Sequence, residues 1–142
     1  ASARLLYDDD PEAALGHAIN ALEREPANVR AMFEKARILK KIGFGIESLE
    51  KREEYLQEAV SLLSAAVKLR PKVGSIWFNL ACYETLVGFD TYDSSVILGH
   101  LGKAIKFDSS LIKEAREDVD LKELREKYKL DFEELLAQES GD

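Results

Sequence analysis

The sequence predicts an all-α protein in which antiparallel pairs of helices stack on one another, and three observations favour this fold class. Apolar residues recur at steps of three and four, as they do along one face of an α-helix. The sequence matches itself when it is shifted by 45 residues. The signals of β-strands, such as alternating β-branched runs and Asn-Gly or Asp-Gly hairpin turns, are missing.

Each expected helix has a local start or stop signal. Asp10 followed by Pro11 is typical of an N-cap and a first helical position, and Pro26, Gly43, Pro71 and Gly88 end helices. We therefore expect a first helix from Pro11 to the closing Pro26, a second from about Asn28 to Gly43, a third over 47–69, a fourth over 73–87 and a fifth from Asp93 or Ser94 to Phe107.

Length and composition bound the function. The chain has 142 residues, and we expect one domain over 1–142. It is 46% hydrophobic and 33% charged, which is enough to bury a core. The net charge of −7 argues against binding nucleic acid through its phosphates, and no apolar run approaches the roughly 20 residues that span a bilayer. A single cysteine, Cys82, excludes a disulfide framework and a cysteine-built metal site, and favours the cytoplasm or another reducing compartment, such as an organelle interior.

The negative charge is concentrated near the C-terminus. Residues 114–142 contain eleven acidic and five basic side chains, whereas residues 1–113 contain sixteen acidic and fifteen basic ones. Residues 1–113 are therefore close to neutral as a whole. The charge of each surface has to be judged from its own residues and not from the net charge of the chain.

The internal matches define repeating units. A shift of 45 aligns Ala14 with Ala59, Ala21 with Ala66, Pro26 with Pro71, Phe33 with Phe78, Ala36 with Ala81 and Gly43 with Gly88. The matched alanines are small enough to let neighbouring helix axes approach closely. Neither helix of a pair can bury its apolar stripe alone, so stacked pairs would share one core.

This pattern resembles the tetratricopeptide repeat. The segment Trp77-Phe78-Asn79-Leu80-Ala81-Cys82-Tyr83 is similar to the first helix of such a repeat, and Ala59-Val60, Leu63, Ala66-Val67 and Pro71 are similar to the second. The resemblance implies a short right-handed superhelix. It divides the chain into a truncated repeat (4–28), a repeat with an extended second helix (29–72), a repeat (73–110) and a degenerate C-terminal cap (111–137). HEAT-type repeats also have periods near 45 and are the second choice.

Three departures from that family matter. Only Arg4-Leu5-Leu6-Tyr7 remain where the first helix of the first repeat is expected. About eleven extra residues fall around 45–55, which is about three helical turns. We therefore expect one long helix over 47–69 that keeps Leu49, Leu56 and Leu63 on one stripe and overhangs the stack of helix pairs. A four-residue insertion falls near 89–92. In the cap, we expect a short helix over 110–116 and further capped helices starting at Asp120 and Asp131.

Catalytic and metal-binding patterns are not evident in the sequence. His17 and His100 are far apart without ligand spacing, and each is expected to be a surface or packing histidine. Asp8-Asp9-Asp10 is interpreted as a helix start with favourable negative charge. Cys82 has no adjacent base and is expected to be a packed thiol. We therefore predict a protein that is not an enzyme and has no cofactor.

A binding surface is the functional signal that remains. The face next to the core stripe on each first helix should line the concave side, and there it is basic and aromatic on an otherwise acidic protein. This favours an acidic or carboxylate-bearing peptide as ligand. The simpler alternative is that Phe33 and Phe78 belong to the core and that the basic side chains are only solvated. The predicted binding residues are Arg30, Phe33, Arg37, Lys40, Lys41, Phe78, Asn79, Lys113 and Arg116.

We therefore expect a non-catalytic protein–protein interaction module: a scaffold, an assembly factor or a co-chaperone. Some members of the resembled family clamp a C-terminal carboxylate, and Asn79 and Lys113 fall at similar slots, but Glu117 stands where an arginine would be needed. The alternative is a regulatory or oligomerisation domain excerpted from a longer protein, which could be an enzyme, that docks through the 47–69 helix. A homodimer through the incomplete N-terminal repeat also stays open.

Overall fold

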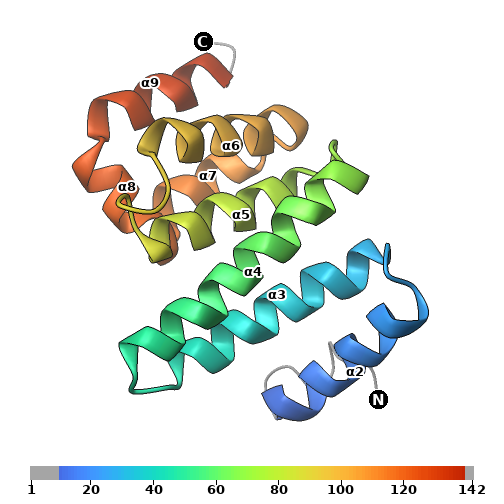
Figure 1. Cartoon of the computed structure of the whole chain (residues 1–142). Coiled ribbons are helices and arrows are strands. Elements are labelled where there is room, and N and C mark those ends of the chain that lie inside the picture. Colours follow the sequence, from blue (N-terminus) through green and yellow to red (C-terminus); the bar gives the residue numbers. More distant parts are fainter. Residues whose placement is uncertain (1–9, 140–142) are drawn as a thin grey trace. The chain divides into compact units, whose positions relative to one another are not determined.

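The computed structural model describes residues 10–139, which contain helices and no β-strand (Figure 1). The predicted all-α fold class is thus confirmed. The residues Arg4–Tyr7, Asp8 and Asp9, on which the truncated first helix and the acidic helix start were predicted, lie outside the described residues. The elements are α2 (Pro11–Arg24), α3 (Val29–Phe44), α4 (Leu49–Leu69), α5 (Gly74–Val87), α6 (Ser94–Phe107), α7 (Leu111–Glu117), the 3-10 helix η1 (Val119–Leu121), α8 (Lys122–Lys127) and α9 (Lys129–Glu139).

The chain divides into two compact units. Unit 1 ends at Pro71 and contains α2, α3 and α4. Unit 2 begins at Lys72 and contains α5 to α9.

The helix starts of unit 1 follow from side-chain caps. Asp10 Oδ1 accepts the N–H of Ala13 at 3.1 Å, and Asn28 Oδ1 accepts the N–H of Ala31 at 3.0 Å. Ser48 Oγ accepts the N–H of Lys51 at 3.3 Å and starts α4. Each cap satisfies a backbone donor that a helix leaves unpaired in its first turn. The predicted boundaries of these helices are therefore correct to within two residues.

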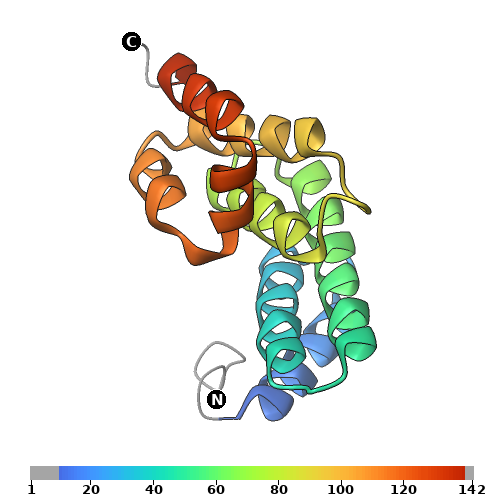
Figure 2. The same cartoon turned by 90° about the vertical axis from the view of Figure 1, so that its left-hand side faces the viewer.

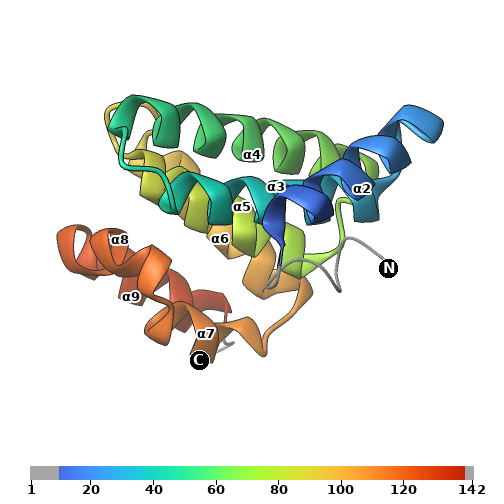
Figure 3. The same cartoon turned by 90° about the horizontal axis from the view of Figure 1, so that it is seen from below.

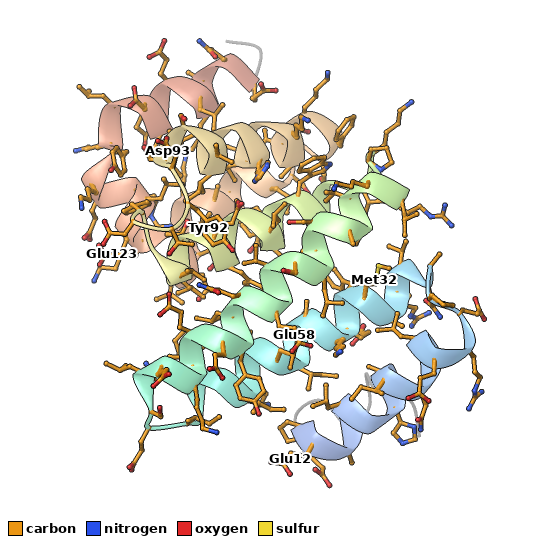
Figure 4. The ribbon with its side chains drawn as sticks, in the orientation of Figure 1. Glu12, Met32, Glu58, Tyr92, Asp93 and Glu123 are labelled. Atoms are coloured by element: carbon orange, nitrogen blue, oxygen red, sulfur yellow. The ribbon has the colours of Figure 1, made fainter. Side chains whose placement is uncertain are left out.

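Small residues let α3 lie close to α2 and α4. Successive helices run antiparallel and side by side (Figure 1 and Figure 3). Ala14 and Ala18 of α2 form a buried cluster with Ile38 of α3. On the other side of α3, Ala36 and Ala59 are completely buried. Figure 4 labels Met32 on α3 and Glu58 on α4; the Glu58 carboxylate pairs with the ammonium of Lys35 at 3.0 Å.

The long helix is confirmed, and its first turn overhangs the end of α3. α4 is continuous over 21 residues, where a flexible loop over 44–56 was the opposing possibility. Leu49, however, is 73% exposed, whereas Leu56 is buried. Arg52 and Tyr55 are the residues of α4 that lie opposite Gly43, near the end of α3. Leu49 is almost one turn earlier on α4, so it extends past the end of α3 and stays largely exposed.

In unit 2, α5 and α6 form an antiparallel pair that requires glycine at one point. A Cβ atom on Gly74 would lie 2.6 Å from the carbonyl oxygen of Ala104 and 2.8 Å from Cβ of Asp108. The start of α5 therefore touches the end of α6 through backbone. Gly88, with φ of 120°, ends α5 in a conformation that favours glycine. Asp93 caps α6 as expected.

The C-terminal helices cover the other side of α6. α9 lies along α6, where Gly102 faces Leu135 (Figure 1 and Figure 2). The expected capped start at Asp120 is wrong. Asp118, not Asp120, is the cap, because its Oδ1 accepts the N–H of Asp120 at 2.8 Å at the start of η1. α9 begins at Lys129, so Asp131 lies inside its first turn.

We predict that Gly74→Ala will destabilise unit 2 by about 2 kcal/mol, because the added methyl group must push apart two backbone segments. Gly99→Ala is the matched control on α6, since nothing lies within 4 Å of a Cβ at that position. It should instead add about 0.5–1 kcal/mol through helix propensity. Urea unfolding followed by the fluorescence of Trp77 measures both. Equal effects of the two changes would contradict the close approach.

Candidate functional site

One surface of unit 1 gathers five of the predicted binding residues. Spacings of three and four place them on one face of α3, and Phe44 continues the series at the end of the helix. We call this surface the α3 stripe; it consists of Arg30, Phe33, Arg37, Lys40, Lys41 and Phe44. Arg30 is exposed, Phe44 is 44% exposed, and the other members are half-buried.

Cations and aromatic rings touch along the α3 stripe. The guanidinium of Arg37 lies 5.9 Å from the ring centroid of Phe33, and Lys40 Nζ lies 5.9 Å from that of Phe44. Arg52 of α4 approaches the Phe44 ring at 5.2 Å and also donates hydrogen bonds to the carbonyls of Gly43 and Ile46. The stripe is thus built of cation–π contacts and is supported at one end by the α3–α4 turn.

The α3 stripe contains no acidic residue. The one acidic residue of α3 is Glu34, which is 7% exposed. Its Oε2 is buried without a hydrogen-bond partner among the described residues. Arg30 and Arg37 are one helical turn away on either side of it. A buried carboxylate is costly unless positive charge is near, so part of the positive charge of these arginines offsets Glu34.

The predicted residues of unit 2 do not form a comparable surface. Phe78 is 6% exposed, which corrects the expectation that its ring faces a partner. The Asn79 side chain donates to the carbonyl of Ser75 at 2.9 Å, within its own helix. Lys113 is exposed on α7. Arg116 is also exposed, but its Nη1 donates to both carboxylate oxygens of Glu133 at 2.9 and 2.6 Å and so ties α7 to α9.

The sequence did not reveal a buried ionisable pair in unit 2. Glu84 of α5 is 3% exposed, and its Oε1 lies 2.7 Å from Nδ1 of His100 on α6. The His100 ring is 5.4 Å from the ring of Trp77, and Lys103 Nζ lies 4.6 Å above that indole. His100 is therefore a packing residue, as expected, but one that is oriented by a buried carboxylate. Sixteen residues separate the pair in the sequence, so no local pattern predicts it.

The loop between α5 and α6 carries two groups with shifted pKa values, and Figure 4 labels both on it. Burial raises the pKa of the Tyr92 phenol above 10.0, and the negative charge of Glu84 raises it further. The hydrogen bonds that Asp93 accepts from the hydroxyl and backbone N–H of Ser95 lower the pKa of its carboxyl.

Residues 10–139 also contain one group of side chains with the atom types of metal ligands. The Cys82 sulfur and the carboxylates of Asp118 and Asp120 lie within 4.8 Å of one another. Cys82 is buried, and both aspartates are partly exposed. The hydrogen bond from the Asp120 backbone accounts for the position of Asp118 without an ion. We therefore assign no metal to this group.

Comparison of the chain with protein-family models, with curated proteins and with solved structures finds no match. In the part of the chain that the structure describes, every helix is too short or too polar to cross a bilayer. The α3 stripe and the contacts of unit 2 are thus the observations from which function is inferred.

We predict that Glu84→Gln will move the pKa of Tyr92 back toward 10.0 but not to it, because burial remains. A raised phenol pKa stabilises the folded state below the unfolded pKa, and this contribution is lost as the pH rises through the folded value. The phenolate absorbance of Tyr92, obtained as the difference from a Tyr92→Phe protein, measures the shift. An unchanged titration in the E84Q protein would show that Glu84 is not the second cause.

Proposed function

We propose that the chain is a non-catalytic protein–protein interaction module whose α3 stripe binds an acidic or carboxylate-bearing segment of a partner. The observation that carries this proposal is the α3 stripe itself: cations in contact with half-exposed aromatic rings, on a chain with a net charge of −7. A scaffold, an assembly factor and a co-chaperone would all use such a surface. The internal repeats and the helix pairs support a tetratricopeptide-type array as its frame.

The chemistry of the α3 stripe suits a carboxylate. Arginine offers several N–H donors in a planar fork, and its bonds to carboxylates are charge-assisted. Arg37 is held against Phe33, so less side-chain entropy is lost when it binds a ligand. The stripe itself contains no acidic residue, so an acidic ligand meets no like charge among its members.

The aromatic rings give the α3 stripe an apolar anchor. Phe44 is 44% exposed, and both Lys40 and Arg52 approach its ring. A partner's apolar side chain packed on this ring would be flanked by positive charge. The anchor on this surface is therefore assigned to Phe33 and Phe44, and Phe78 is left out because it is buried.

We predict that Arg37→Glu with Lys41→Glu will remove the partners that the intact chain captures by affinity, because like charges then face an acidic segment. The matched control is Arg24→Glu with Arg70→Glu. Both arginines are exposed and lie in unit 1, but neither belongs to the α3 stripe. For a recovered partner, affinity should fall by about tenfold or more, with a weaker dependence on salt. If both charge-reversed proteins retain the same partners, the α3 stripe is not the binding surface.

A second candidate function is docking through the start of α4, and the exposure of Leu49 favours it. Leu49 is 73% exposed at the start of α4, and Phe44 is 44% exposed at the end of α3. Large apolar side chains gathered at one end of a helix pair are typical of an oligomerisation or regulatory contact.

If that contact forms, Leu49→Asp should shift the protein from a dimer to a monomer, whereas Leu69→Asp, at the other end of α4, should not. Sedimentation velocity over a range of protein concentrations measures this. A protein that is monomeric at every concentration would argue against self-docking at Leu49.

A further inference from the structure

Like the α3 stripe, the outward face of α6 is made of residues none of which is acidic. α6 contains no aspartate or glutamate among its 14 residues. Steps of three and four place its solvent-facing residues on one side, and we call them the α6 face: Val96, Gly99, His100, Lys103, Lys106 and Phe107. The opposite side of α6 is occupied, because Ile97, Leu101 and Ile105 are completely buried.

The α6 face combines apolar and positive groups around the open space over Gly99, which we call the gap. Val96 is 47% and Phe107 is 36% exposed, and both lysines are exposed. Gly99 lies in the middle of this face, with nothing within 4 Å of the position of a Cβ atom. Glycine costs helix propensity there, and no contact within the described residues explains it. The gap would admit a side chain from outside.

The polar groups of the α6 face are held in place before any ligand arrives. Lys103 Nζ lies 4.6 Å above the ring of Trp77, which is itself 8% exposed. His100 packs on the same indole, and its Nδ1 is bound by the buried carboxylate of Glu84. A ligand could therefore meet the imidazole only at Nε2. Preorganised donors lose little entropy on binding an anion.

We propose that the α6 face docks an acidic amphipathic helix of a partner protein. Carboxylates of that helix would pair with Lys103 and Lys106, and one of its apolar side chains would fill the gap over Gly99. The charge of the face selects an acidic occupant. A helix is favoured over an extended segment because the features recur turn by turn, and Val96 and Phe107 are roughly 16 Å apart along the axis. The α6 face lies in unit 2 and does not depend on the α3 stripe.

The chain contains its own reporter, because Trp77 is its one tryptophan. The probe is an acetylated and amidated amphipathic helical peptide of glutamate, leucine and alanine, titrated into the intact chain. We expect a saturable change in Trp77 emission, with heat in parallel calorimetry, that weakens as salt is added. The same peptide with glutamine in place of glutamate should bind at least about tenfold more weakly.

Variants separate the α6 face from other surfaces. Lys103→Glu, Lys106→Glu and Gly99→Leu should each weaken binding by about fivefold or more, by removing charge or by filling the gap. Lys68→Glu, an exposed lysine of α4, is the matched control and should bind normally. Lys103 supports Trp77, so Lys103→Glu could disturb the fold. Lys106 Nζ lies 5.7 Å from the ring centroid of Phe107, and nothing lies within 4 Å of a Cβ position on Gly99, so Lys106→Glu and Gly99→Leu keep the test decisive.

Four outcomes would overturn the inference. The first is an absence of both heat and fluorescence change, and the second is equal affinity for the glutamine peptide. The third is binding that Arg37→Glu abolishes and Lys106→Glu leaves intact, which would place the peptide on the α3 stripe and uphold the proposed function alone. The fourth is self-association of the chain that Lys106→Glu abolishes, which would make a second copy the occupant.

Discussion

Close approach of helix axes through small residues is the constraint on which both units depend. Between α3 and α4, it rests on alanines that are completely buried. Between α5 and α6, it rests on Gly74, which touches the backbone of Ala104, and α9 reaches α6 at Gly102. Tight pairing of this kind uses one side of each helix for the core. It leaves the other side to carry charge, and this is why both surfaces proposed for binding lie on single helix faces.

Local signals made most of the secondary structure predictable. Asp10, Asn28 and Asp93 accept backbone hydrogen bonds at the helix starts where the sequence placed them. The long α4 followed from an insertion of about three whole turns. The cap at Asp118 was missed because Asp118 and Asp120 are both suitable capping residues. The choice between them depends on where α7 ends, and this depends on tertiary packing rather than on local sequence.

The predicted binding residues share one surface only where a single helix carries them. The members of the α3 stripe share a face by periodicity alone. Phe78 was misplaced because α5 is buried on nearly every side, from Ile76 to Thr85, so its pattern does not show which face is open. The Glu84–His100 contact joins two helices, and Lys103 meets Trp77 across the same pair. Such contacts are a property of the packed hairpin and cannot be read from spacing.

The net charge of the chain does not oppose an acidic ligand as strongly as its value suggests. Most of the excess negative charge lies in residues 114–142, and the α3 stripe belongs to unit 1, which is near neutral. Repulsion from exposed carboxylates fades over about 8 Å at physiological salt, whereas paired charges meet at about 3–4 Å. The attraction between an acidic ligand and the cations that it touches is therefore stronger than the repulsion from the distant carboxylates. Selectivity would arise because an acidic segment is attracted only where it can touch such a face.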